Sequence, residues 1–304
     1  MHSVLILLST YNGDKYLREQ LDSILAQKGV DVHILVRDDG SRDLTIDIIE
    51  DYIDHYPNKI YFEKGRNVGC LNSFMNLLRI AAEQYPEYDY YAFADQDDVW
   101  FEDKLYNAAD ALSKSDDLYK LYFCPHQLVD ADLKRLPTKR IKYKLTLAEA
   151  FVFQPCIGCS MVFNYALLKE ASRADSSMLS IHDAWLYILA LSLGANVICG
   201  DKVGMLYRQH SSNTIGSHQS IVSTWKRRWN SFVDNKRFRS SIARYILDNY
   251  GASISTREKQ VIENISNYCH STKTKFRILS SSDYNTSKKL HSFLFKIAII
   301  TNRI

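Results

Sequence analysis

The chain lacks any long apolar run. No stretch of its 304 residues approaches the ~20 consecutive apolar residues that a membrane-spanning helix needs. The first apolar segment, Val4–Leu8, is far shorter than the core of a secretory signal peptide, and the polar turn Asn12–Asp14 follows it. We therefore expect no signal peptide and no membrane span. The prediction is a cytoplasmic protein whose only membrane contact is peripheral, at the inner face of the cell membrane.

Cysteine is sparse and offers no disulfide framework. The six cysteines are Cys70, Cys124, Cys156, Cys159, Cys199 and Cys269. Most of them lie in apolar segments, which is typical of reduced thiols in a cytoplasmic protein. Cys156 and Cys159 form a C-x-x-C pair, but no second pair follows at zinc-finger spacing. A zinc site is therefore disfavoured.

The net charge of +3 hides an uneven distribution along the chain. From Ile221 to the end there are 16 Lys and Arg against 5 Asp and Glu, whereas the rest of the chain carries 22 against 30. The basic part can meet anionic lipid or another polyanion, or it can simply be a solvated helical surface. We expect one large folded domain, of a size that can hold an active site, over residues 1–219 and a basic helical extension over residues 220–304.

Two segments of that extension suit a membrane interface. Trp225–Trp229 combines tryptophan with basic residues, and Phe293–Ile300 is mostly apolar. The alternative is an ordinary helical subdomain or an oligomer contact.

Apolar periodicity in the first 100 residues alternates between two patterns. Val4–Leu8, Val32–Val36, Ile60–Phe62 and Tyr90–Ala94 read as strands. Between them, apolar residues recur at helical spacing. This alternation predicts an α/β fold with a mostly parallel, Rossmann-like sheet that has helices on both faces.

Polar clusters follow three of these strands directly. They are Ser9–Tyr11, Asp38–Asp39 and Asp95–Asp98. In open α/β sheets, ligands bind beyond the carboxyl ends of the strands. Their convergence at one edge predicts a nucleotide site.

The last cluster contains three carboxylates within four residues. Asp95, Asp97 and Asp98 repel one another unless a cation or a proton intervenes. Mg²⁺ and Mn²⁺ prefer such oxygens, and a metal held here can bridge to a diphosphate. The alternative for this cluster is a polar loop with a helix cap.

Other candidates carry similar alternatives. Asp38 and Asp39 can accept from a base imide or a ribose hydroxyl, or they can serve an Asp-Gly turn. Tyr11 can stack on a base. Asp183, beside aromatic residues, can be a general base or a helix cap. His210 can be a metal ligand, although a lone histidine is more often a packing residue.

Five segments, in order and spacing, resemble family 2 glycosyltransferases with the GT-A fold. They are Ser9–Gly13, Ser23–Gln27, Asp38–Asp43, Asn67–Gly69 and Asp95–Trp100. The resemblance extends over about residues 3–215. The last segment is similar to the bacterial rhamnosyltransferase-like branch, whose members build O-antigen, capsule or wall polysaccharide.

The resemblance implies a role for each matching residue. Nucleotide-binding residues would be Ser9, Thr10, Tyr11, Asp38, Asp39, Asn67 and Asp95. Ligands to Mn²⁺ or Mg²⁺ would be Asp95, Asp97 and His210, with Asp97 the strongest. Asp183 would be the catalytic base, and Gly158–Ser160 matches a segment on the acceptor side. Members often have Glu before the base, where this chain has His182.

The implied reaction is an inverting transfer. A sugar such as rhamnose would pass from a UDP- or dTDP-linked donor to a hydroxyl of a saccharide acceptor that is lipid-linked. No nucleic-acid partner is expected. One rival is a nucleotidyltransferase acting on sugar phosphates, but the chain lacks the Gly-rich basic loop expected near the first strand. Another is a non-catalytic sugar-binding protein, which we would expect to lose the acidic positions.

Overall fold

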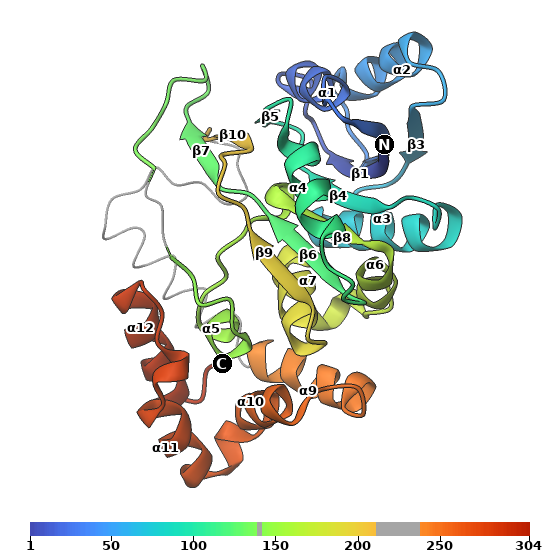
Figure 1. Cartoon of the computed structure of the whole chain (residues 1–304). Coiled ribbons are helices and arrows are strands. Elements are labelled where there is room, and N and C mark those ends of the chain that lie inside the picture. Colours follow the sequence, from blue (N-terminus) through green and yellow to red (C-terminus); the bar gives the residue numbers. More distant parts are fainter. Residues whose placement is uncertain (139–141, 211–237) are drawn as a thin grey trace.

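A seven-stranded sheet forms the centre of the molecule. The computed structural model describes residues 1–138, 142–210 and 238–304 (Figure 1). Strand order across the sheet is β3-β2-β1-β4-β8-β6-β9. The strands are β1 (His2–Thr10), β2 (Val30–Asp38), β3 (Ile60–Lys64), β4 (Tyr90–Ala94), β6 (Lys120–Phe123), β8 (Met161–Asn164) and β9 (Asn196–Cys199).

Most neighbouring strands in this sheet are parallel, as the sequence predicted. β1 runs parallel to both β2 and β4, and β2 runs parallel to β3. β8 alone is antiparallel to its neighbours β4 and β6. The sequence did not predict β8, because it lies in a segment of mixed pattern after residue 141. Parallel pairing puts the carboxyl ends of β1, β2 and β4 at one edge.

Each face of the sheet buries its own core, because side chains alternate along a strand. Leu5 and Leu7 of β1 face one core, and Val4, Ile6 and Leu8 face the other. Helices α1, α2 and α4 cover the second face, and α3, α6 and α7 cover the first (Figure 1). Their bounds are α1 (Leu17–Leu25), α2 (Thr45–His55), α3 (Cys70–Gln84), α4 (Lys104–Ser113), α6 (Tyr165–Ser172) and α7 (His182–Ser192).

A small second sheet stands beside the end of β4. Its order is β5-β10-β7, from β5 (Val99–Trp100), β10 (Met205–Arg208) and β7 (His126–Val129). β5 follows the acidic cluster directly, and β10 pairs with it. This pairing brings residues 207–210 next to residues 95–98, although more than 100 positions separate them in the chain.

The described part of the C-terminal extension is helical, as predicted. It contains α9 (Phe238–Tyr250), α10 (Thr256–Asn267), α11 (Thr272–Ser280) and α12 (Lys289–Ile300). Their buried side chains join the same core as α5 (Leu147–Val152) and α7. The extension is thus built onto one face of the sheet. The predicted boundary at residue 219 and the segment Trp225–Trp229 lie outside the described residues, so the domain division stays a prediction.

Within α12, most apolar side chains point inward. Leu294, Phe295 and Ile299 are buried, whereas Phe293 and Ile300 are exposed. The apolar character of this helix therefore serves packing first. Among the described residues, none of the helices has both the length and the apolarity to cross a membrane.

Candidate active site

A cavity of about 790 Å³ opens at the edge where β1, β2 and β4 end. Segments far apart in sequence line it, from the first strand to residue 210. The sequence-predicted site residues among the lining are Ser9, Thr10, Tyr11, Asp39, Asn67, Asp95, Asp97, Asp183 and His210. One predicted residue, Asp38, lies behind the wall of the cavity.

Asp38 is fully buried and already accepts four hydrogen bonds. Its carboxylate takes the hydroxyls of Thr10 (3.1 Å) and Ser41 (2.5 Å) and the amides of Gly40 (3.0 Å) and Ser41 (2.8 Å). Gly40 has a φ of 84°, which suits glycine in a tight turn. These contacts are those of the Asp-Gly turn, the alternative for this position. A contact between Asp38 and a nucleotide stays a prediction.

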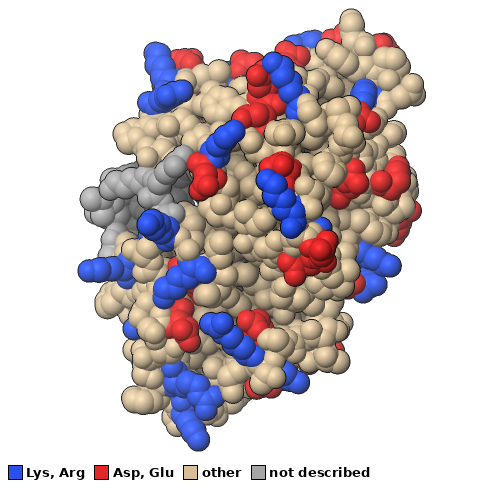
Figure 2. Space-filling view, in the orientation of Figure 1, with Lys and Arg blue, Asp and Glu red and all other residues tan. Residues whose placement is uncertain are grey.

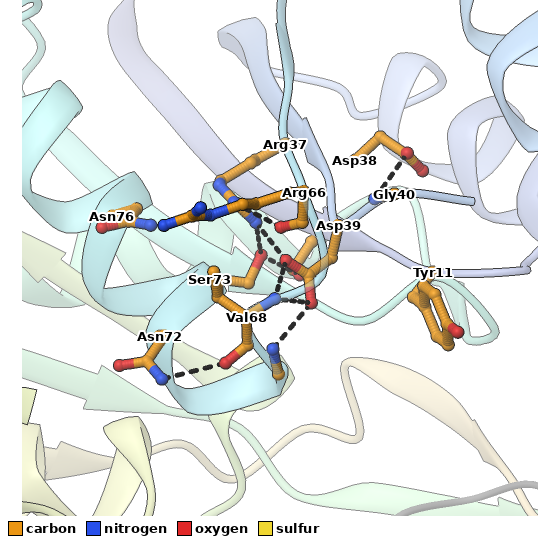
Figure 3. Close-up of polar contacts among 12 residues, drawn as sticks. Tyr11, Arg37, Asp38, Asp39, Gly40, Arg66, Val68, Asn72, Ser73 and Asn76 are labelled. Atoms are coloured by element: carbon orange, nitrogen blue, oxygen red, sulfur yellow. Dashed lines mark hydrogen bonds and ion pairs between the residues drawn. The ribbon is translucent and has the colours of Figure 1, made fainter. Parts of the chain in front are cut away.

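Asp39 lies in the cavity wall and ties together the loop beside it (Figure 3). Its carboxylate accepts from the amides of Val68 (3.0 and 3.1 Å) and Gly69 (2.8 Å). The guanidinium of Arg37 forms a buried ion pair with it at 2.6 Å. Asp39 therefore fixes the backbone of the Asn67–Gly69 turn. The family resemblance implies a nucleotide contact at Asn67 in this turn.

The end of β1 contributes a rigid rim to the same region. Tyr11 is 46% exposed, so its ring face is open to a stacking partner. The side chain of Gln96 accepts from the Tyr11 amide (2.8 Å) and donates to the Tyr11 carbonyl (3.1 Å). Sequence reasoning missed Gln96. Its position between Asp95 and Asp97, two predicted site residues, could have indicated that it also belongs to the site.

The acidic cluster presents two of its carboxylates to the cavity. Asp97 Oδ2 lies 2.8 Å from His210 Nε2, so the structure brings this predicted pair together. Burial and the nearby charge of Asp97 raise the pKa of Asp95 to about 7. A cation bound beside these carboxylates would relieve the repulsion between their negative charges.

Asp98 faces away from the cavity. It is fully buried, accepts from the amide of Arg208 at 3.1 Å, and has a pKa raised by burial. Ligand atoms of Asp95, Asp98 and Cys159 lie within 4.8 Å of one another, a second set that could hold a metal. Asp98 and Cys159 are buried and do not line the cavity. We therefore favour Asp97 and His210, which do.

The donor set at Asp97 and His210 fits a divalent cation. Two ligands at right angles around Mg²⁺ or Mn²⁺, each bonded at ~2.1 Å, stand ~3 Å apart. The separation of 2.8 Å between Asp97 and His210 is compatible with that. Asp95 lines the same cavity and would complete the protein's share of the ligands.

Asp183 lines the same cavity, at the start of α7. Its Oδ2 accepts from the Gly158 amide at 3.0 Å and its Oδ1 from the Ala184 amide at 2.6 Å. Burial raises the pKa of Asp183 to about 6. Ile181, not Asp183, is the N-cap residue of α7. A buried carboxylate with a raised pKa in a cleft is suited to general-base chemistry.

His182 beside it is packed as an apolar group. Its ring stacks on Phe74 with centroids 3.8 Å apart and meets the edge of Phe93. Burial lowers the pKa of His182 to about 3, so the ring is neutral. A Cβ on Gly158 would come within 2.6 Å of its Nε2. Glycine at 158 therefore allows the approach that sets both His182 and Asp183 in place.

Arg208 is a site residue whose role sequence reasoning left open. Its buried guanidinium donates to the carbonyl oxygens of Asp97 (2.7 Å) and Ala131 (2.6 Å) and to the carboxylate of Glu19 (2.5 Å). It thus anchors the backbone of the acidic cluster. The sequence analysis named His210 in this segment as a possible metal ligand. His210 lines the cavity, and Arg208 supports the acidic cluster through its hydrogen bond to the Asp97 carbonyl.

The fold and this cavity define a class: a GT-A glycosyltransferase. A sequence model described as Glycosyl transferase family 2 matches residues 5–171. A dTDP-rhamnosyl transferase, RfbG, of Shigella flexneri is 31% identical over 249 residues, covering 78% of this chain and 82% of the relative. An uncharacterized glycosyltransferase of Rickettsia typhi is 27% identical over 238 residues, covering 76% of this chain and 71% of that protein.

Solved structures agree on the fold. S. aureus TarS in complex with UDP-GlcNAc superposes with a TM-score of 0.60 at 16% identity, covering 100% of this chain and 82% of that one. The mannosyltransferase PcManGT from Pyrobaculum calidifontis, in complex with GDP-Man and Mn²⁺, gives 0.55 at 18% identity, covering 98% and 80%. The chain belongs to glycosyl transferase family 2. It is a glycosyltransferase with a nucleotide-sugar donor, and the sequence-based resemblance is confirmed.

Proposed function

We propose that this enzyme transfers rhamnose, with inversion, from a dTDP-linked donor to a hydroxyl of a lipid-linked saccharide. The observation that carries the proposal is the cavity itself, which is lined by the buried carboxylate of Asp183 and by an acidic cluster with His210. The similarity to a dTDP-rhamnosyl transferase over most of both chains supports the donor. The UDP-GlcNAc bound to TarS, a more distant protein, makes a UDP-sugar the competing donor.

Asp183 is the base in this proposal. Its carboxylate takes the proton from the acceptor hydroxyl as that oxygen attacks the anomeric carbon of the donor. The amides of Gly158 and Ala184 hold the carboxylate in one orientation. Since the attack comes from the face opposite the departing diphosphate, a single displacement inverts the configuration. A second carboxylate nucleophile is not required, in contrast to retaining glycosidases.

Asp95, Asp97 and His210 would hold the divalent cation. When bound, Mn²⁺ or Mg²⁺ would neutralise the negative charge that develops on the diphosphate leaving group. The carbonyl of Asp97 is held by Arg208, which keeps the acidic cluster at the end of β4. At the other end, Tyr11, Ser9 and the Asn67–Gly69 turn would receive the nucleoside.

A donor screen tests this proposal. The protein is incubated with dTDP- and UDP-sugars, with and without Mn²⁺, and nucleotide release is measured. We expect release from dTDP-rhamnose that depends on the cation. With a saccharide acceptor, NMR of the product should show the inverted anomer. Release from a UDP-sugar alone would overturn the dTDP donor. In a separate assay with a sugar phosphate and a nucleoside triphosphate, release of pyrophosphate would indicate a nucleotidyltransferase. No turnover in either assay would favour a non-catalytic sugar-binding protein.

The proposed lipid-linked acceptor gives the C-terminal helices a role at the membrane surface. Phe276 of α11 and Phe293 of α12 are 73% and 55% exposed. From Cys269 to the end there are seven Lys and Arg and one Asp. Figure 2 shows Lys and Arg side chains gathered over the part of the molecule where α11 and α12 lie. Exposed aromatic rings among basic residues suit an anionic lipid surface.

These helices are connected to the acceptor side of the cavity. Phe153 packs against the start of α12, with its ring 4.6 Å from that of His291 and 4.3 Å from Lys288 Nζ. The chain then runs from Phe153 directly to Gly158, whose amide holds Asp183. Flotation with vesicles containing anionic lipid tests the surface: Phe276→Ser with Phe293→Ser should abolish binding, and binding unchanged by both would overturn it.

A further inference from the structure

Arg37 is a buried charge at a place where the sheet should be apolar. It belongs to β2, and side chains alternate along a strand, so Arg37 points to the same face as Leu35, which lies in the core. Only 7% of its side chain is exposed. A charge buried there is stable only if it is paired and fully hydrogen-bonded. The mechanism proposed above does not use it.

The guanidinium of Arg37 connects three separate segments (Figure 3). Nη1 donates to Asp39 Oδ1 at 2.6 Å and to Ser73 Oγ at 2.9 Å, and Nη2 donates to the carbonyl of Arg66 at 3.2 Å. The Ser73 hydroxyl lies 2.6 Å from that of Ser9. Arg37 thus reaches the end of β1, the start of α3 and the loop after β3.

The chain is arranged to admit this side chain. Ser9 and Arg37 are register partners in the parallel pair β1–β2, so both point to α3. A Cβ on Gly65 would lie 2.4 Å from Arg37 Nη2. Glycine at 65 therefore lets the loop close over the guanidinium, so that the Arg66 carbonyl can accept from it.

Both ends of this network reach the cavity. Ser9 and Asp39 line it, and Asp39 in turn holds the amides of Val68 and Gly69. Two walls of the nucleoside end are therefore set by one side chain that does not itself line the cavity.

We propose that Arg37 is a positioning residue for donor binding: it holds Ser9, through Ser73, and the Asn67–Gly69 turn, through Asp39, in the geometry that receives the nucleoside. This proposal rests on the proposed assignment of that end of the cavity to the nucleoside. Arginine suits the task because its planar fork can donate to several acceptors at once, which an ammonium on a flexible stem cannot do in the same geometry.

Two variants test Arg37 without leaving a buried charge unpaired. Arg37→Lys keeps the charge but loses the planar fork of donors. Ser73→Ala removes the hydrogen bonds of the Ser73 hydroxyl with Arg37 and with Ser9, and it leaves the Arg37–Asp39 ion pair. Ser172→Ala in α6 is the matched control, because its hydroxyl is also largely buried and bonds the carbonyl of Lys169. Calorimetry measures the Kd for dTDP and UDP, initial rates give KM for donor and acceptor with kcat, and thermal melting reports folding.

We expect Arg37→Lys to raise the nucleotide Kd and the donor KM about tenfold, the effect of losing a hydrogen bond from a charged group. Ser73→Ala should raise both about fivefold, as for a neutral hydrogen bond. The kcat at saturating donor and the acceptor KM should stay within about twofold of wild type, and Ser172→Ala should match wild type throughout.

A folded Arg37→Lys or Ser73→Ala variant with a wild-type nucleotide Kd would overturn the proposal, as would a loss confined to kcat or to the acceptor KM. Should Arg37→Lys fail to fold, Ser73→Ala decides. Nucleotide binding by the wild-type protein distinguishes a failure of the Arg37 proposal from a failure of the proposed dTDP donor. If it binds UDP and not dTDP, the dTDP donor is wrong, and the variants are compared with UDP.

Discussion

Two regions of the cavity differ in the surroundings of their carboxylates. The proposed nucleoside end lies around Asp39 and the Asn67–Gly69 turn, and the proposed transfer end contains Asp95 and Asp183. At the nucleoside end, the carboxylates of Asp38 and Asp39 together accept from hydroxyls, amides and one guanidinium of the protein itself. At the transfer end, burial raises the pKa of both Asp95 and Asp183.

This difference indicates that one region of the cavity is preorganised for binding and that the other carries the reactive groups. Buried polar groups are normally hydrogen-bonded, and exceptions call for an explanation. A satisfied network holds a binding surface in one shape before the ligand arrives, which lowers the cost of binding. Carboxylates whose pKa is raised by burial, or that need a cation, gather at catalytic sites. Under the proposed function, the nucleoside end is thus shaped before a ligand arrives, whereas the transfer end would need a bound cation.

The largest effect should come from Asp183→Asn. Without a carboxylate to take the proton, kcat should fall about a thousandfold, while the nucleotide Kd stays within about twofold. Stopped assays for kcat and calorimetry for the Kd make the measurement. Asp175→Asn, an exposed aspartate that caps a short helix nearby, is the matched control. Near-wild-type turnover by Asp183→Asn would mean that the transfer end has another base.

The next effect concerns the cation. Chelation of divalent ions, or Asp97→Asn, should lower kcat/KM about a hundredfold, since several kcal/mol of charge stabilisation would be lost. Added Mn²⁺ should restore the chelated enzyme but not the variant. Asp98→Asn is the informative comparison: Asn keeps an acceptor for the Arg208 amide, so its loss should be several-fold at most. Equal losses in both variants would mean that Asp98 is a ligand as well.

The acidity of the base gives a third, smaller effect. Asp183 must be ionised to accept a proton, and burial raises its pKa to about 6. The assay keeps Mn²⁺ saturating, because the pKa of the proposed ligand Asp95 is also raised, to about 7. Activity should then fall as the pH drops through 6, with about a tenfold loss at pH 5. The nearby ionisable groups are His182, Cys70, Cys156 and Asp95. An acid limb near pH 4 in kcat would contradict the burial of Asp183 during turnover.

The sequence predicts the features of the fold and the site that depend on local patterns, and it does not predict those that depend on contacts between distant segments. The strand–helix alternation and the polar groups after β1, β2 and β4 are local patterns, so the parallel sheet and its nucleotide edge could be predicted. The approach of His210 to Asp97 and of Gly158 to Asp183 depends on tertiary contacts between residues that are 113 and 25 positions apart. The resemblance to a family, not periodicity, pointed to those residues.

Supporting residues were the least predictable part. Arg37 breaks the apolar pattern of a buried strand, which is a signal, but its partners Ser73 and Arg66 come from other elements. Gln96 stands inside the acidic motif and contacts Tyr11 across 85 positions. Such contacts depend on side-chain geometry in the folded chain, and no spacing rule in one sequence encodes them.

The smallest effect on activity should come from Asp38, and it would show whether the comparison holds. Asp38→Ala removes the acceptor for two hydroxyls and two amides at the turn after β2. We expect the free energy of unfolding in urea to fall by about 2–3 kcal/mol, with Asp38→Asn losing less. The nucleotide Kd of the folded variants should change less than threefold. If instead the Kd rises more than tenfold while stability is kept, Asp38 contacts the nucleotide, as the sequence resemblance implied. Its saturated hydrogen bonds would then rearrange when the donor binds, and the nucleoside end would be less preorganised than its contacts indicate.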